Sequence, residues 1–260
     1  MKKWPILILL LSLFACNQTI EQEDTAAATP PEVEWQVLFN GEDLSGWTPK
    51  FAGSPLGENY KNTFQVEEGI LKVSYDEYDT FNQEFGHLFY EKPFSHYILR
   101  VEYRFVGEQV PNGPGWAFKN SGAMLHCQDP KTMTVAQDFP VCIEAQFLGG
   151  DGISPRSTGN LCTPGTNVFL ADTLTTNHCI NSTSPTFATE DWVQMDMIVY
   201  GDSLIHHVVE GDTVLTYTKM QIGDNGNAPN EGAPVGSGYI SLQAESHPVH
   251  FRKVELKELK

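Results

Sequence analysis

In residues 97–105, the charged side chains of Arg100, Glu102 and Arg104 alternate with apolar ones. A period of two makes one face of an extended strand apolar and the other charged, as in a half-buried strand of an antiparallel sheet. Such a strand must bury its apolar face against a second layer. This constraint favours a sandwich or jelly roll.

Further strands follow the same pattern. Residues 64–73 and 204–218 predict two hairpins, the first turning at Glu68-Gly69 and the second around Gly211. Three more short strands are expected at 192–200, 239–244 and 249–256. Because no segment shows a helical period, the sequence predicts an all-β fold, a sandwich of antiparallel sheets.

The amino terminus has the features of an export signal. Lys2 and Lys3 precede an apolar run that is too short to span a bilayer, and Ala15 lies directly before Cys16. Residues 1–15 are therefore predicted to be a signal peptide and Cys16 to carry a lipid. An ordinary signal peptide followed by a chance cysteine is the alternative.

Residues 16–34 contain few large apolar side chains, which predicts a flexible tether between the lipidated cysteine and a folded domain at 35–260. The chain is thus expected to be anchored by lipid to a membrane of the cell envelope. Either the periplasm or the outer-membrane surface fits.

The chain has five cysteines, and assigning Cys16 to the lipid leaves an even number. In an oxidising compartment these four predict two disulfides, with three possible connectivities. The pairs Cys127–Cys142 and Cys162–Cys179 are favoured because each closes a short local loop. A zinc site is disfavoured because the spacing lacks a C-x-x-C knuckle.

The formal net charge is −17, and removing Lys2 and Lys3 (−17 minus 2) makes it about −19 at neutral pH. An acidic surface argues against a nucleic-acid partner, because phosphates need a basic face. It fits a neutral or cationic ligand.

Three predicted strands each place polar, chemically active side chains on one face. Alternation puts Glu144 beside Gln146, and Gln243 beside Glu245, while His126 is expected to face away from its apolar neighbours. If the strands adjoin, these groups line a polar concave surface of the kind that binds sugar hydroxyls. Ordinary solvated faces are the alternative.

A long irregular stretch, 149–191, is rich in Gly, Pro, Ser, Thr and Asn and includes Cys162 and Cys179. Loops of this length are commonly functional. Its Arg156 and His178 are expected to fold over the site.

Several short motifs occur in a fixed order along the whole predicted domain. They begin with Leu38-Phe-Asn-Gly-Glu-Asp-Leu-Ser-Gly-Trp47 and continue through the segments 64–71, 120–122, 144–146, 158–165, 205–211 and 241–252. As an ordered set they resemble the 3-keto-disaccharide hydrolase domain family. The resemblance implies a concanavalin A-like jelly roll that cleaves the glycosidic bond of sugars oxidised at C3.

The resemblance also implies roles for particular residues. The family's Glu-x-Gln strand matches Glu144 and Gln146, and its Leu-Gln-x-Glu strand matches Gln243 and Glu245. Its hairpin histidine matches His207. The usual Asn-Gly of that hairpin turn is Glu210-Gly211 here, a departure expected to affect only the turn.

The expected chemistry follows from the keto group. A carbonyl at C3 acidifies the C2 proton, so a base can remove it and the resulting enediolate expels the C1 substituent; water can then add back. Glu144, His126 or His207 could be the base, and a divalent metal of unknown identity could hold the oxyanion. Direct hydrolysis would instead need two carboxylates, for which Glu144 and Glu245 are the obvious pair.

Two other classes of function stay open. A non-catalytic, lectin-like carbohydrate-binding module would present exposed aromatic platforms, for which Trp116 and Trp192 are candidates. A structural surface lipoprotein would need no small ligand. Fold similarity cannot choose among these.

Overall fold

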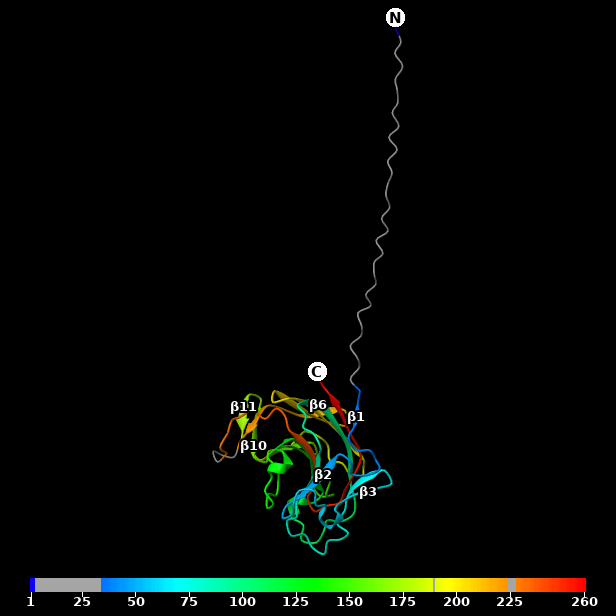
Figure 1. Cartoon of the computed structure of the whole chain (residues 1–260), viewed down its shortest axis with the longest axis vertical. Helices are drawn as coiled ribbons and strands as arrows, with labels where there is room; N and C mark the ends of the chain where they lie inside the picture. Colours follow the sequence, from blue (N-terminus) through cyan, green and yellow to red (C-terminus); the bar gives the residue numbers. More distant parts are fainter. Residues whose placement is uncertain (3–33, 189, 224–227) are drawn as a thin grey trace. The chain divides into compact units, whose positions relative to one another are not determined.

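The computed structural model describes residues 1–2, 34–188, 190–223 and 228–260. From Glu34 onward they belong to one compact unit built from two antiparallel sheets, with three one-turn 3₁₀ helices between strands. Figure 1 shows the strands curving around a common interior. The fold is an all-β sandwich, as the alternating pattern predicts. The 3₁₀ helices are η1 (Tyr60–Asn62), η2 (Gly115–Ala117) and η3 (Pro130–Thr132).

The larger sheet has ten strands, in the order β11-β10-β15-β14-β13-β6-β17-β4-β3, with β1 paired to β17. Its strands are β1 (Gln36–Val37), β3 (Phe64–Glu67), β4 (Ile70–Val73), β6 (His96–Phe105), β10 (Thr166–Leu170), β11 (Thr173–Thr175), β13 (Val193–Tyr200), β14 (Leu204–Val209), β15 (Asp212–Ile222) and β17 (Val249–Glu258). Both predicted hairpins are confirmed, as β3–β4 and β14–β15.

The smaller sheet has seven strands, in the order β12-β9-β8-β7-β16-β5-β2. Its strands are β2 (Trp47–Phe51), β5 (Gly86–Tyr90), β7 (Asn120–Cys127), β8 (Ile143–Leu148), β9 (Asn160–Cys162), β12 (Cys179–Ile180) and β16 (Tyr239–Ala244). The strands that carry the sequence motifs of interest, β16, β7, β8 and β9, are consecutive neighbours in this sheet.

The hydrophobic core fills the space between the two sheets. Leu99 and Val101 of β6 are fully buried, and the ring of Tyr103 stacks on Phe147 of β8 with 4.2 Å between centroids. The alternating pattern of β6 therefore points its apolar side at the smaller sheet. Arg100 and its charged neighbours lie on the outer face.

The stretch 149–191 is more regular than its composition indicates. Instead of one irregular loop, it contains β9, β10, β11 and β12, each two to five residues long. Strands this short leave little periodicity to detect, and cross-strand pairing stabilises them despite their poor propensity. The expectation of a single long loop was wrong.

One of the two expected disulfides is present, Cys162–Cys179, which joins β9 to β12. Cys127 and Cys142 are free thiols, so that pairing was wrong. Burial, followed by contact with Cys127, raises the pKa of Cys142 well above its usual value. Because thiol–disulfide exchange needs a thiolate, this apolar setting disfavours oxidation of the pair.

The predicted signal peptide, Cys16 and most of the tether lie outside the described residues. In the part of the chain that the structure describes, no helix is long and apolar enough to cross a membrane.

Candidate active site

Strand register places Glu144 and Gln146 on one face with residues of the two strands that flank β8, β7 and β9. Glu144 and Gln146 of β8 lie opposite Met124 and Gly122 of β7. On the other side of β8, the same two residues lie opposite Cys162 and Asn160 of β9. Residues directly opposite each other in a sheet share a face, so period-two alternation brings these groups together on the outer surface of the smaller sheet.

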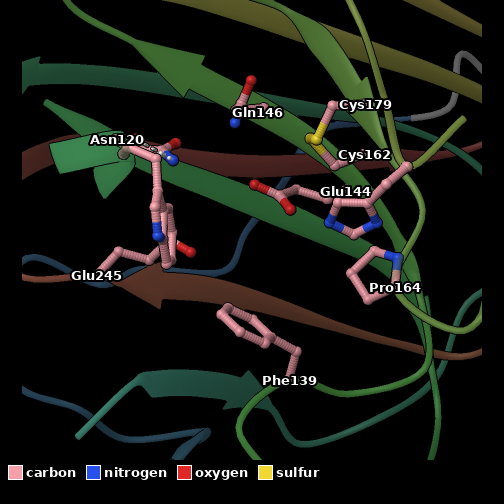
Figure 2. Close-up of a pocket in the computed structure, with 10 residues that line it drawn as sticks. Asn120, Phe139, Glu144, Gln146, Cys162, Pro164, Cys179 and Glu245 are labelled. Carbon is pink, nitrogen blue, oxygen red and sulfur yellow. Dashed lines mark hydrogen bonds between the residues drawn. A yellow bond between two sulfur atoms is a disulfide. The ribbon is translucent and has the colours of Figure 1, made fainter. Parts of the chain in front are cut away.

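A pocket of about 350 Å³ opens on this face. Figure 2 shows the carboxyl group of Glu144 directed into it from β8, with the Cys162–Cys179 disulfide along one side. Its lining residues come from β7, β8, β9, the start of β12 and the loops around them: Trp116, Asn120, Phe139, Glu144, Gln146, Cys162, Pro164, His178, Cys179 and Glu245.

Glu144 is buried, with only 5% of its surface exposed. Loss of solvation raises the pKa of its carboxyl to about 8. Gly122 makes room for this side chain, because a Cβ at that position would lie 3.0 Å from Glu144 Cγ and 3.0 Å from Glu144 Oε1. A residue without a Cβ beside this carboxyl is thus a packing requirement of the site.

Glu245 follows the end of β16 and is also buried, at 3% exposure. Burial raises the pKa of its carboxyl well above the usual value, and the charge of Glu144 raises it further. Within the described residues, Glu245 Oε2 has no hydrogen-bond partner, and no ion pair reaches either carboxyl. Two such acids cannot both ionise easily, so the pair loses its two protons in separate steps.

The amide groups are held in defined orientations. Asn160 Nδ2 donates to Gln146 Oε1 at 3.0 Å, so the carbonyl side of Gln146 is occupied and its amide nitrogen is left to face a ligand. Asn160 is itself fixed by the backbone N–H of Ser182 at 2.9 Å. The oxygen of Asn120, buried at the pocket, lacks a partner within the described chain. These amides are positioned to bind hydroxyl or carbonyl groups.

The rim of the pocket is apolar and aromatic. Trp116, on η2, is 56% exposed and stacks on Phe85 with 5.7 Å between ring centroids. Phe85 in turn contacts Phe139, another lining residue, at 4.9 Å. Pro164 and the disulfide complete this side. The pocket therefore has a polar floor from the sheet and an apolar rim from the loops.

Of the residues expected to bind substrate, Glu245, Gln146 and His178 line the pocket. Gln243 lies on the same face, opposite His87 of β5, but it is fully buried beneath the pocket and neither of its amide atoms has a partner in the described structure. His87 is also fully buried, and neither of its ring nitrogens has a hydrogen-bond partner in the described structure.

Arg156 is not among the lining residues. Its guanidinium donates hydrogen bonds to the carbonyls of Gly149 at 2.6 Å and Phe118 at 2.8 Å, and these bonds link two loops. The expectation that it folds over the site was wrong, because backbone carbonyls in neighbouring loops take up its donors.

His126 does not share the face of Glu144, contrary to the alternation argument. It has a φ of 50°, and the pairing of β7 with β16 shifts register beside it. This β-bulge inserts an extra residue and reverses the alternation. The imidazole turns inward, against Tyr97 at 5.9 Å and near the carbonyl of Gly201 at 3.2 Å.

His207 is on β14 of the other sheet and is fully buried. One ring nitrogen contacts the carbonyl of Gly159 at 2.8 Å and the other the hydroxyl of Tyr217 at 2.8 Å. Burial lowers its pKa to about 4. A neutral imidazole with both nitrogens engaged inside the core is structural, so neither expected histidine base lies in the pocket.

Sequence reasoning missed Phe139 and Pro164 as lining residues, since nothing local distinguishes a loop proline or phenylalanine from any other. Asn120 had a signal, because it shares the alternation of Gly122 on β7. A three-ligand metal centre is not formed: among the described residues, no group of three or more His, Cys, Asp and Glu side chains is placed to hold an ion.

Comparison with known proteins fits this arrangement. A family model described as a 3-keto-alpha-glucoside-1,2-lyase-like domain matches residues 34–257. The chain belongs to this family. The match covers both sheets and every residue that lines the pocket. A search of curated proteins found no match.

Solved structures share the fold at low sequence identity. A protein of Parabacteroides distasonis provisionally named a glycosyl hydrolase is 14% identical, with a TM-score of 0.55, covering 87% of this chain and 100% of the other. A Bacillus subtilis protein of unknown function with a galectin-like fold is 12% identical, with a TM-score of 0.55 over 86% and 94% of the two chains. The Bacillus licheniformis beta-glucanase is 12% identical, with a TM-score of 0.50 over 87% and 98%.

Proposed function

We propose that this protein cleaves the glycosidic bond of 3-keto-glycosides by elimination, followed by addition of water. The observation that carries the proposal is that two buried carboxyls, Glu144 and Glu245, line one pocket of about 350 Å³. Membership of the lyase-like family and the glycosyl hydrolase name of a structural neighbour support it.

In this mechanism Glu144 is the base. Its carboxylate removes the proton from C2, and the C2–H electron pair forms the C2=C3 bond of an enediolate as the C3 carbonyl oxygen gains negative charge. Collapse of the enediolate restores the C3 carbonyl, forms C1=C2 and breaks the bond from C1 to the leaving oxygen. The base has a pKa of about 8, close enough to neutrality to accept a proton and return it.

Glu245 is the acid in the same mechanism. Because burial and the charge of Glu144 keep its pKa high, it holds a proton when Glu144 has lost its own. It donates that proton to the departing oxygen, so that a neutral alcohol leaves. Water then adds across C1=C2, which gives net hydrolysis. Gln146 donates a hydrogen bond from its amide nitrogen to a sugar oxygen, and Asn120 accepts one from a sugar hydroxyl at its free amide oxygen.

The divalent metal expected from the sequence stays a prediction, and no step of the mechanism passes through it. Two carboxyls and neighbouring amide oxygens are hard donors that suit a cation such as Mg²⁺ or Ca²⁺, but a third acidic or imidazole ligand is missing from the described residues. Loss of turnover in a chelator, restored by one added metal, would support the ion.

The decisive experiment is incubation with a 3-keto-glucoside carrying deuterium at C2. We expect release of the alcohol, transient formation of a 1,2-unsaturated 3-keto sugar and a primary isotope effect on turnover. Release without that intermediate and without an isotope effect would favour direct hydrolysis by the carboxyl pair. The rate should rise as the pH increases through about 8, because the base must be ionised.

A lectin-like binding module is the second candidate, and the exposed ring of Trp116 favours it. Calorimetry with oxidised and unoxidised glycosides separates the two. Binding of both forms with no turnover of either would establish the module and overturn the enzyme.

We further propose that a lipid on Cys16 holds the domain at the cell envelope, where its acidic surface suits a neutral sugar ligand rather than nucleic acid. Incorporation of labelled fatty acid into the wild-type chain, and its loss in Cys16→Ala, tests the anchor. Labelling of the variant would contradict it.

A further inference from the structure

We propose that the substrate carries an aromatic group without negative charge on the leaving side of the glycosidic bond, and that this group stacks on Trp116. The inference rests on the proposed function, because it assigns the oxidised sugar ring to the polar floor of the pocket. It names the chemical class of the remainder of the substrate.

Trp116 is an aromatic ring held in place at the pocket mouth. Phe85 covers it at 5.7 Å with only 23° between the ring planes, while 56% of the tryptophan surface stays exposed. Phe85 is itself packed against Phe139 at 4.9 Å. A large apolar surface that is supported from below and open above is suited to stacking with a flat ligand.

The backbone that carries this ring is also restrained. Pro114 precedes η2, and its carbonyl accepts hydrogen bonds from the backbone N–H of Ala117 at 2.9 Å and from Gln109 Nε2 at 2.9 Å. Asn120 Nδ2 lies 3.4 Å from the Trp116 carbonyl. Because the platform is ordered before binding, little conformational entropy is lost when a ligand stacks on it.

The distribution of polar groups favours an aromatic leaving group over a second sugar. The floor offers Glu144, Glu245, Gln146 and Asn120, whereas the rim offers Trp116, Phe139, Pro164 and the disulfide, listed together as the lining of one pocket. A second pyranose at the rim would bury hydroxyls with only the exposed His178 to bind them, and unpaired buried hydroxyls are costly.

The charge of the lining residues further restricts the class of leaving group. Glu144 and Glu245 are the acidic lining residues, and the lining contains no lysine or arginine. An anionic group near two carboxyls would be repelled and would find no positive partner. The aromatic group therefore carries no negative charge.

The test compares two 3-keto-glucosides whose leaving groups are both simple alcohols, benzyl and methyl, so that leaving-group chemistry is nearly matched. We expect wild type to favour the benzyl compound in kcat/KM by about 10-fold or more, mainly through KM. Trp116→Ala should remove this preference, because it lowers kcat/KM for the benzyl compound by more than it lowers kcat/KM for the methyl compound. Trp116→Phe should restore most of the preference.

Trp192→Ala is the matched control. Its ring lies between Arg104 and Arg252, at 4.6 Å from each guanidinium carbon, on the outer face of the larger sheet. It should leave the benzyl preference unchanged. Equal loss of both reactions in Trp116→Ala, or faster cleavage of 3-keto-trehalose than of the benzyl compound by wild type, would overturn the inference.

Failure of the proposed function is recognised separately. Quenching of tryptophan fluorescence by unoxidised benzyl and methyl glucosides reports binding without turnover. Tighter benzyl binding that is lost in Trp116→Ala, with no cleavage of any keto-glycoside, would overturn the enzyme and keep the aromatic subsite. Cleavage of keto-glycosides with no benzyl preference would keep the enzyme and overturn the aromatic subsite.

Discussion

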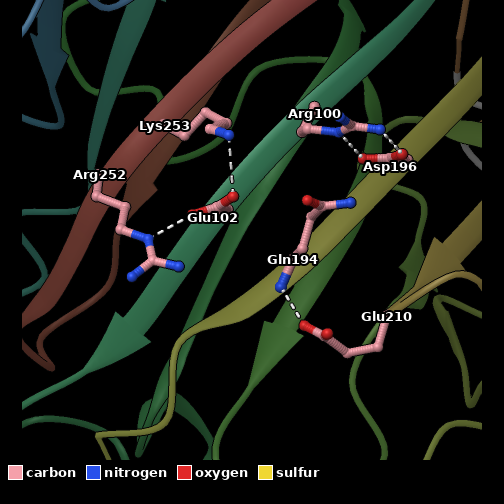
Figure 3. Close-up of polar contacts among 7 residues, drawn as sticks. All are labelled: Arg100, Glu102, Gln194, Asp196, Glu210, Arg252 and Lys253. Carbon is pink, nitrogen blue, oxygen red and sulfur yellow. Dashed lines mark hydrogen bonds and ion pairs between the residues drawn. The ribbon is translucent and has the colours of Figure 1, made fainter.

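Both sheets carry carboxyl groups on their outer faces, but the surroundings of these groups differ between the two sheets. On the larger sheet, Figure 3 shows Glu102 contacting both Arg252 and Lys253, and Asp196 contacting Arg100. The Arg100–Asp196 pair is bidentate, with two nitrogen–oxygen distances of 2.8 Å. Both of these carboxyls have cationic partners.

On the smaller sheet, Glu144 and Glu245 are buried side chains without such partners in the described structure. The pKa values respond accordingly. Burial raises the pKa of Glu144 to about 8. For Glu102 burial acts in the same direction, but hydrogen bonds from Arg252 and Lys253 outweigh it and lower the pKa. The same residue type thus stabilises the fold on one sheet and is poised for proton transfer on the other.

The largest expected effect comes from removing the base. Glu144→Gln keeps the shape of the side chain but cannot accept a proton, so turnover of a 3-keto-glucoside should fall about 10²- to 10⁴-fold. Glu102→Gln, the matched change on the paired sheet, should leave turnover within about twofold. The measurement is kcat for both variants at a temperature where circular dichroism shows them folded. Equal losses would remove the functional contrast between the sheets.

The second expected effect is opposite pH dependence of stability. A pKa raised in the folded state gives stability that is complete below the unfolded value of 4.5 and is lost as the pH rises through about 8. As the pH rises, the unfolding free energy of Glu144→Gln should therefore fall less than that of wild type, by on the order of a few kcal/mol.

Glu102 has a lowered pKa, so its contribution is present above its unfolded value and is lost as the pH falls through the folded one. Glu102→Gln should instead reduce the loss of unfolding free energy at acidic pH. Urea unfolding from about pH 2 to about pH 9 checks both limbs of the pH profile. Identical profiles for the two variants would contradict the assigned environments.

A smaller effect is expected at the glycine that faces Glu144. Gly122→Ala places a Cβ 3.0 Å from Glu144 Cγ and displaces the carboxyl. We expect kcat to fall about 10-fold, with a change in unfolding free energy of about 1 kcal/mol. Measurements of kcat and thermal melts on one preparation of the variant separate the effect on turnover from the effect on stability. A loss of stability with unchanged kcat would show that the position of Glu144 tolerates the shift.

The smallest effect is expected on the paired face. The Arg100–Asp196 pair is partly exposed, with side-chain exposures of 27% and 15%. A double-mutant cycle with Arg100→Ala and Asp196→Ala should give a coupling of about 0.5–1 kcal/mol, reduced by salt. A coupling of several kcal/mol would mean that this face, too, is strongly desolvated.

Much of the site was predictable because alternation is a local property of an extended backbone. It placed Glu144 on the same face as Gln146 and located the turns of the hairpins 64–73 and 204–218. It failed at His126, where the bulge depends on the pairing of β7 with β16. It also could not assign His207 to the opposite sheet, because sheet order is a long-range property.

The sequence by itself determined most of the longer strands, the polar face of β8 and the all-β sandwich class. Only the tertiary structure decided that Glu245 comes close enough to Glu144 to raise its pKa, and that Trp116 opens at the mouth of the same pocket. The physical reason is that charge coupling and desolvation depend on distance and burial in space. Neither quantity is encoded in the spacing of residues along a chain.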